Sequence, residues 1–90
     1  MKTADGFDDA IAGIIRQMNQ PAKVVYDYGK CVQILMERDD MSEEDAVEFM
    51  EFNVVSAYVG EDTPAWMMPY TEELIEYYAE EEDLNDVSTF

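Results

Sequence analysis

The sequence predicts a small all-α domain, a bundle of about four short helices. Apolar residues recur at helical spacing in several segments, and residues typical of helix starts and ends flank those segments. The connections between them are brief. The alternative is an α+β fold with one or two short strands, at Val24–Tyr26 or Val54–Val59, because both stretches contain β-branched residues.

The first expected helix spans about Gly6 to Asn19. Gly13 weakens it by about 1 kcal/mol relative to alanine. Pro21 ends it, because a proline disfavours helical geometry in the residue before it. The apolar residues of this segment fall at i, i+4, i+7 and i+11, on one side of a helix: Phe7, Ile11, Ile14 and Met18.

Asp27 is a plausible N-cap for a second helix, about Tyr28 to Arg38. Its inward side is expected to consist of Tyr28, Val32 and Leu35. Cys31 lies beside them and is interpreted as a small buried apolar residue, because the chain has no histidine that would activate a thiol.

The third expected helix begins after Ser42, with Asp45 three residues later, as in a capping box. Gly60 suits the left-handed position that follows a helix. The expected core side of this helix repeats at i, i+3, i+7 and i+11: Val47, Met50, Val54 and Tyr58.

Thr71 is expected to cap a last helix, about Glu72 to Asp83. Residues after about 84 are expected to form a frayed tail of a single acidic domain that spans residues 1–90. Trp66 lies in a short segment between two prolines. It is interpreted either as part of a loop packed on the core or as an apolar anchor for a partner.

Charge divides the chain into two parts. All five lysines and arginines lie within the first 38 residues, so residues 39–90 carry the whole net charge of −17. A small soluble domain usually has a net charge of magnitude about 2–8. Such a surface repels nucleic acid and anionic membranes and attracts a basic partner.

The composition offers little for catalysis. Without histidine, and with one cysteine, the chain lacks the usual bases, nucleophile pairs and zinc ligands. The acidic stretches do not match the ligand spacing of a calcium-binding loop. We therefore predict that the protein is not an enzyme and has no cofactor or dedicated metal site. It is expected to be cytoplasmic, because the N-terminal sequence lacks the apolar stretch of a signal peptide.

Carboxylates recur at helical spacing on the third and fourth expected helices. No lysine or arginine is interspersed, although a solvated helix normally mixes charges of both signs. Stripes of this kind could approach the charge density of a nucleic-acid backbone. The predicted partner-binding residues are Glu43, Glu44, Glu48, Glu51, Glu61, Asp62, Trp66, Glu73, Glu76 and Glu80.

The segment from Tyr26 to Trp66 contains the runs ILMERDDMS, EEDAVEF and FNVVSAYVGEDTP. These runs resemble a recurrent family of short acidic proteins encoded by bacteriophages and bacteria. The family has no established activity, so the resemblance transfers no catalytic residues. At the position of Asp40 the family often has glycine. The resemblance implies a phage origin, and small acidic phage proteins include anti-CRISPR and anti-restriction inhibitors.

Together, charge and resemblance lead to one hypothesis. The protein is expected to be a phage-type inhibitor that blocks a basic, nucleic-acid-binding defence protein of the host through an acidic, DNA-mimicking surface. A CRISPR effector or a restriction enzyme is the expected class of target. The alternative is a small self-associating phage accessory or assembly protein, such as a homodimer, without an inhibitory role.

Overall fold

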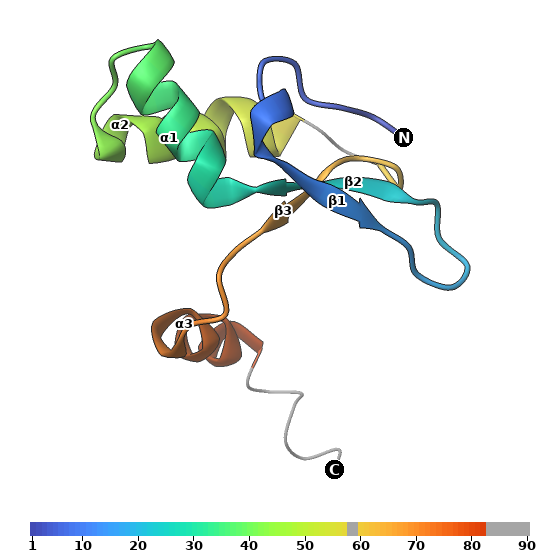
Figure 1. Cartoon of the computed structure of the whole chain (residues 1–90). Helices are drawn as coiled ribbons and strands as arrows, with labels where there is room; N and C mark the ends of the chain where they lie inside the picture. Colours follow the sequence, from blue (N-terminus) through green and yellow to red (C-terminus); the bar gives the residue numbers. More distant parts are fainter. Residues whose placement is uncertain (58–59, 83–90) are drawn as a thin grey trace.

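The computed structural model of the chain is an α+β fold (Figure 1). It describes residues 1–57 and 60–82, and the side chains of residues 80–82 are outside the description. The described part contains three α-helices and a three-stranded sheet with the strand order β1-β2-β3. The prediction of an all-α bundle is therefore wrong, and the fold belongs to the class that the sequence left as the alternative.

The first expected helix does not form. Its residues instead make a short 3-10 helix, η1 (Asp8–Ala10), and strand β1 (Ile11–Ile15), which pairs antiparallel with β2 (Lys23–Asp27). Gly13 disfavours a helix, whereas isoleucine and valine favour strands. Pairing between these two β-branched segments outweighs the helical spacing of the apolar residues. Asn19, with φ of 65°, lies in the turn that joins the two strands.

The exposed fractions of the side chains contradict the buried apolar stripe that was expected for that helix. Phe7 is buried, but Ile11, Ile14 and Met18 are 44%, 64% and 88% exposed. On a strand, successive side chains point to opposite faces, so residues chosen at helical spacing do not share one face. The register of β1 also shifts between Ile11 and Gly13, as expected for a β-bulge.

Tyr26 occupies the middle of the sheet and is fully buried. Its ring stacks on Trp66 of β3 (Ala65–Met67), with the ring centroids 5.3 Å apart. Strand β3 runs parallel to β2 and pairs Trp66 with Tyr26. The hydroxyl of Tyr26 accepts a hydrogen bond from the backbone N–H of Ala4 at 2.7 Å. One side chain thus holds the N-terminal segment and β3 to the central strand.

Helix α1 (Tyr28–Arg38) follows β2 directly, and its prediction is confirmed. The Asp27 carboxylate accepts a hydrogen bond from the backbone N–H of Lys30, as expected for an N-cap. The expected inward side is buried, and so is the cysteine beside it: Tyr28, Cys31, Val32 and Leu35.

Helix α2 (Glu43–Phe49) begins as predicted, with the Ser42 hydroxyl accepting a hydrogen bond from the backbone N–H of Asp45 at 3.1 Å. A π-helical turn, η2 (Met50–Val54), and a 3-10 turn, η3 (Val55–Ala57), continue it. Residues 54–57 are therefore helical, and the strand that was left open for Val54–Val59 is absent from its described part.

The buried side of this helical segment differs by one position from the prediction. Ala46, Met50 and Val54 are buried, whereas Val47 is 38% exposed. The fourth predicted residue, Tyr58, lies outside the described residues. The small side chain of Ala46, rather than the larger Val47, belongs to the core that α1 and α2 share.

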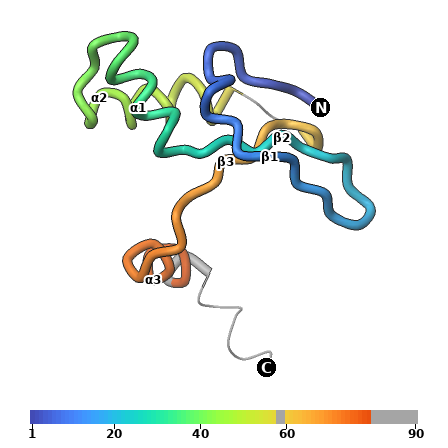
Figure 2. The backbone as a smooth tube through the Cα atoms, in the orientation of Figure 1, coloured from blue at the N-terminus to red at the C-terminus, as the bar shows by residue number. Residues whose placement is uncertain are grey.

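Helix α3 (Glu72–Glu82) begins after Thr71, whose hydroxyl accepts a hydrogen bond from the backbone N–H of Leu74. Its predicted end at Asp83 and the expected frayed tail lie outside the described residues. The remaining helices lie above and to one side of the sheet, and α3 lies below it, joined to β3 by an extended segment (Figures 1 and 2).

We expect Tyr26→Phe to lower the free energy of unfolding by about 1–3 kcal/mol, because the buried N–H of Ala4 loses its acceptor. Urea denaturation measures this change. Tyr70→Phe is the matched control, because Tyr70 is 91% exposed and its variant should unfold like the wild type. Equal stability of the two variants would contradict the role assigned to the Tyr26 hydroxyl.

Asp40 has a φ of 56°, in the left-handed region that favours glycine. We expect Asp40→Gly to raise the free energy of unfolding by about 0.5–1 kcal/mol, because glycine has no Cβ to strain this conformation. Asp40→Asn removes the same charge but keeps the Cβ, so it should change stability less. If both variants were stabilised equally in thermal denaturation, charge and not backbone geometry would be the cause.

Candidate partner-binding surface

Helix α2 presents a dense group of carboxylates to solvent. Four acidic residues occupy its first six positions, and all are exposed: Glu43, Glu44, Asp45 and Glu48. The ion pairs within the described chain join Lys2 to Asp62 and Arg38 to Asp39, so none of the four α2 carboxylates is neutralised by a cation there. Acidic residues in a first turn also favour the helix dipole, which gives three of them a structural role.

Aromatic side chains lie beside these carboxylates. Phe52 is 74% exposed, a large apolar area for a surface position. Phe49 is half-buried and packs against the core. Together with carboxylates from α2, they line a shallow open hollow, formed by Met41, Asp45, Glu48, Phe49, Phe52 and Asn53. We call the exposed carboxylates of α2, together with this hollow, the α2 acidic surface.

The sequence did not predict the aromatic part of this surface. Phe52 lies off the expected apolar stripe, and that position was its one available signal. Phe52 belongs to the π-helical turn η2, which follows α2. Single π-helical turns frequently occur at functional sites.

Glu51 lies on the same helical segment but is turned toward α1. One of its carboxylate oxygens accepts a hydrogen bond from the Tyr28 hydroxyl at 2.6 Å. Burial, and then the hydrogen bond and negative charge of Glu51, raise the pKa of the Tyr28 phenol well above its ordinary value. Glu51 therefore helps to hold η2 against α1, and it is less available to a partner than the α2 carboxylates.

Three further predicted residues lie away from the α2 acidic surface. Glu61 and Asp62 are in the turn before β3, and the Asp62 carboxylate lies 3.8 Å from the Lys2 ammonium. Trp66 is half-buried in β3, with its ring against Tyr26. The structure thus places Trp66 in the packing of the sheet, on the face that the helices cover.

The acidic residues of α3 form a separate group. Glu73 and Glu76 are exposed on α3, and Glu80 belongs to the same helix, although its side chain lies outside the description. Figure 1 shows α2 and α3 on opposite sides of the sheet. The structure therefore does not bring the two predicted stripes together into one surface.

Cys31 is fully buried among apolar residues. Burial, with a smaller contribution from the charge of Asp27, raises the pKa of its thiol to about 11. This environment suits the predicted role as a packing residue.

Within residues 1–57 and 60–82 there is no cluster of three or more acidic or cysteine side chains placed to hold a metal ion. In the same residues, no helix has the length and apolar character needed to cross a membrane.

We expect the free energy of unfolding to fall as the pH rises above about 9. Tyr28 and Cys31 have raised pKa values in the folded state, so the unfolded chain loses their protons first and is favoured at alkaline pH. Each group contributes at most about 1.4 kcal/mol per pH unit. Urea titrations at pH values between about 8 and 11 measure the slope.

Cys31→Ala isolates one of the two contributions. The substitution removes the thiol alone, so the variant should show a shallower decline between the ordinary thiol pKa of 9.0 and the folded value of about 11. Identical slopes for the variant and the wild type would show that burial of the thiol does not affect stability in this range.

Comparison with protein-family models, with curated proteins and with solved structures finds no match to this chain.

Proposed function

We propose that the protein binds a basic, nucleic-acid-binding protein of a bacterial host, in the host cytoplasm, and blocks it by occupying its nucleic-acid site. The observation that carries this proposal is the α2 acidic surface, where carboxylates without cationic partners in the described chain lie beside the exposed Phe52. A CRISPR effector or a restriction enzyme is the proposed class of target. The proposal assigns no catalytic step and no cofactor.

Charge density supports mimicry of a phosphate backbone. The acidic residues between Glu43 and Glu48 occupy about 8 Å of helix axis, given a rise of about 1.5 Å per residue. Each strand of duplex DNA carries one charge per about 3.4 Å of axis. Helix α2 alone therefore offers a comparable linear charge density to lysine and arginine side chains of a DNA-binding groove.

The exposed side chain of Phe52 provides an apolar contact, which carboxylates alone do not. Ion pairs at the edge of an interface contribute mainly to association rate and specificity, whereas buried aromatic anchors contribute most of the affinity. Phe52 projects from the edge of the acidic group and is available to enter an apolar pocket of the partner. Such an anchor would distinguish one target protein from basic surfaces in general.

To test the proposal, the wild-type protein is immobilised and exposed to bacterial lysate at low salt. The retained proteins should be nucleic-acid-binding proteins, and duplex DNA should release them, because both ligands would occupy the same groove. A variant with Glu43→Lys, Glu44→Lys and Glu48→Lys should retain at least about tenfold less of them. Phe52→Ala should also weaken retention by about tenfold or more.

A triple variant of α3 is the matched control: Glu72→Lys, Glu73→Lys and Glu76→Lys. It changes the net charge by the same amount on the other acidic helix, so it should retain the partner. If the two triple variants lost binding equally, net charge rather than the α2 acidic surface would be responsible. Retained proteins that DNA does not displace would also contradict the proposal. Thermal denaturation of each variant shows whether the fold persists.

A further inference from the structure

One face of the sheet lacks a covering layer in the described chain. The buried side chains of Val24 and Tyr26 point toward the helices, so alternation along β2 places Lys23, Val25 and Asp27 on the opposite face. The register adds residues of both neighbouring strands to this face: Gly13, Ile15, Ala65 and Met67. We call these seven residues the open sheet face.

The open sheet face is apolar and hollowed at its centre, with Lys23 and Asp27 at opposite ends of β2. Ile15 and Met67 are 41% and 44% exposed. Between them the small residues Gly13 and Ala65 leave a shallow depression, and the lining of this depression comes from the three strands alone. A sheet with an apolar face normally buries that face against another layer. The face is therefore suited to receive an apolar helix.

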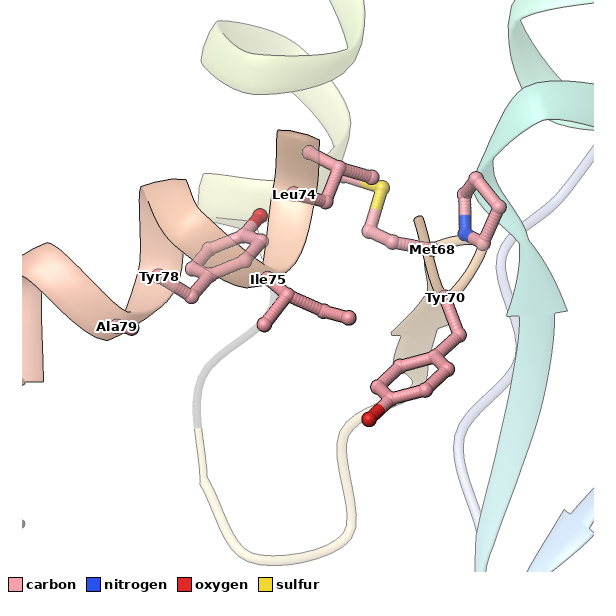
Figure 3. A pocket seen from close by; sticks show the side chains of 7 residues that line it. Met68, Tyr70, Leu74, Ile75, Tyr78 and Ala79 are labelled. Atoms are coloured by element: carbon pink, nitrogen blue, oxygen red, sulfur yellow. The ribbon is translucent and has the colours of Figure 1, made fainter. Parts of the chain in front are cut away.

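Helix α3 has an apolar side that is only partly covered. Leu74 is half-buried, whereas Ile75 and Tyr78 are each 40% exposed. Figure 3 shows the Met68 side chain next to Leu74, while Ile75 and Tyr70 border an open apolar hollow beside the helix. A helix of this length is marginally stable alone in water, so packing of its apolar side must contribute to its stability.

The charges and lengths of the two surfaces match. Residues 10–26 contain no acidic residue and two basic ones, Arg16 and Lys23, whereas α3 carries acidic residues and no basic one. The carboxylate of β2, Asp27, lies at the other end of the strand and caps α1. In a chain of net charge −17, the end of the hairpin near the turn, with Arg16 and Lys23, is therefore the part that attracts α3. Helix α3, with 11 residues, is about 16 Å long, and a strand of five residues is also about 16 Å long.

Two observations favour a second copy of the chain as the source of the covering helix. The segment after β3 leads α3 away from the sheet of its own chain (Figure 2). Moreover, each chain carries both the open sheet face and the matching helix. A dimer with twofold symmetry would therefore bury the open sheet face and the apolar side of α3 of both chains, as in a closed dimer that exchanges one element.

We propose that the protein forms a twofold dimer in which α3 of each copy lies across the open sheet face of the other. Ile75 and Tyr78 fill the depression over Gly13 and Ala65. The carboxylates of α3 lie near Lys23 and Arg16 of the partner copy. The dimer buries the open sheet face and the apolar side of α3, and it leaves the α2 acidic surface exposed on both copies. The inference does not depend on the proposed function.

Sedimentation equilibrium over a wide concentration range tests the proposal. The wild type should be dimeric. Met67→Glu, which places a charge on the open sheet face, and Ile75→Glu, which places one on α3, should each raise the dimer dissociation constant at least about tenfold. Phe52→Glu is the matched control, because it adds the same charge at an exposed apolar position outside the proposed interface and should leave the dimer intact.

Mixing the two interface variants gives the sharpest result. A mixed dimer contains one intact interface, between the normal α3 of Met67→Glu and the normal sheet face of Ile75→Glu. The mixture should therefore associate more tightly than either variant alone. Circular dichroism shows whether Ile75→Glu, at a position that is 40% exposed, keeps the wild-type fold.

Several results would overturn the proposal. A wild type that is monomeric at all concentrations would do so. So would a mixture that associates no more tightly than the separate variants, since a dimer formed through another surface would behave in this way. If Ile75→Glu lowered the melting temperature of a monomer without changing its mass, α3 would be covering the sheet of its own chain.

Discussion

The packing of Tyr26 is the interaction on which the remaining structure depends. Its ring lies against Trp66, and its hydroxyl accepts the N–H of Ala4, so three segments distant in sequence meet at one buried side chain. Strand β3 has only three residues, and the N-terminal segment has neither helix nor strand before η1. Neither segment has enough hydrogen bonds of its own to stay in place. Arg38 adds a second attachment, because its guanidinium donates to the Gly6 carbonyl and lies over the Phe7 ring.

The unequal distribution of charge along the chain becomes a separation of surfaces in the fold. The β1–β2 hairpin carries Arg16 and Lys23 near its turn and one carboxylate, Asp27, at the other end of β2. Helix α2 carries carboxylates beside the exposed Phe52, and α3 carries carboxylates beside an apolar side. The two proposals use different parts of this arrangement. The first proposal places a basic partner on α2, whereas the second places another copy of the chain against the hairpin and α3. A dimer would thus present two α2 acidic surfaces and would gain in avidity for a partner with two basic sites.

The candidate site was predictable in composition but not in arrangement. Sequence alone located the carboxylates of α2 and α3, because helical spacing and the lack of basic residues are visible there. It could not show that Glu51 is hydrogen-bonded to Tyr28, that Asp62 is paired with Lys2, or that Trp66 is packed on Tyr26. Each of these contacts joins residues far apart in the chain. Phe52 was missed because its position off the apolar stripe does not show that it lies beside Phe49 and the α2 carboxylates.

Local signals determined what the sequence alone could predict. The caps at Asp27, Ser42 and Thr71 begin helices where expected, because a cap is a hydrogen bond between residues three positions apart. The burial of Cys31 beside Val32 and Leu35 follows equally from spacing within one helix. Only the tertiary structure decided that Ile11–Ile15 is a strand, since its helical spacing was overridden by pairing with Lys23–Asp27. The same holds for the position of α3, because whether an amphipathic helix finds a partner depends on surfaces that no local pattern contains.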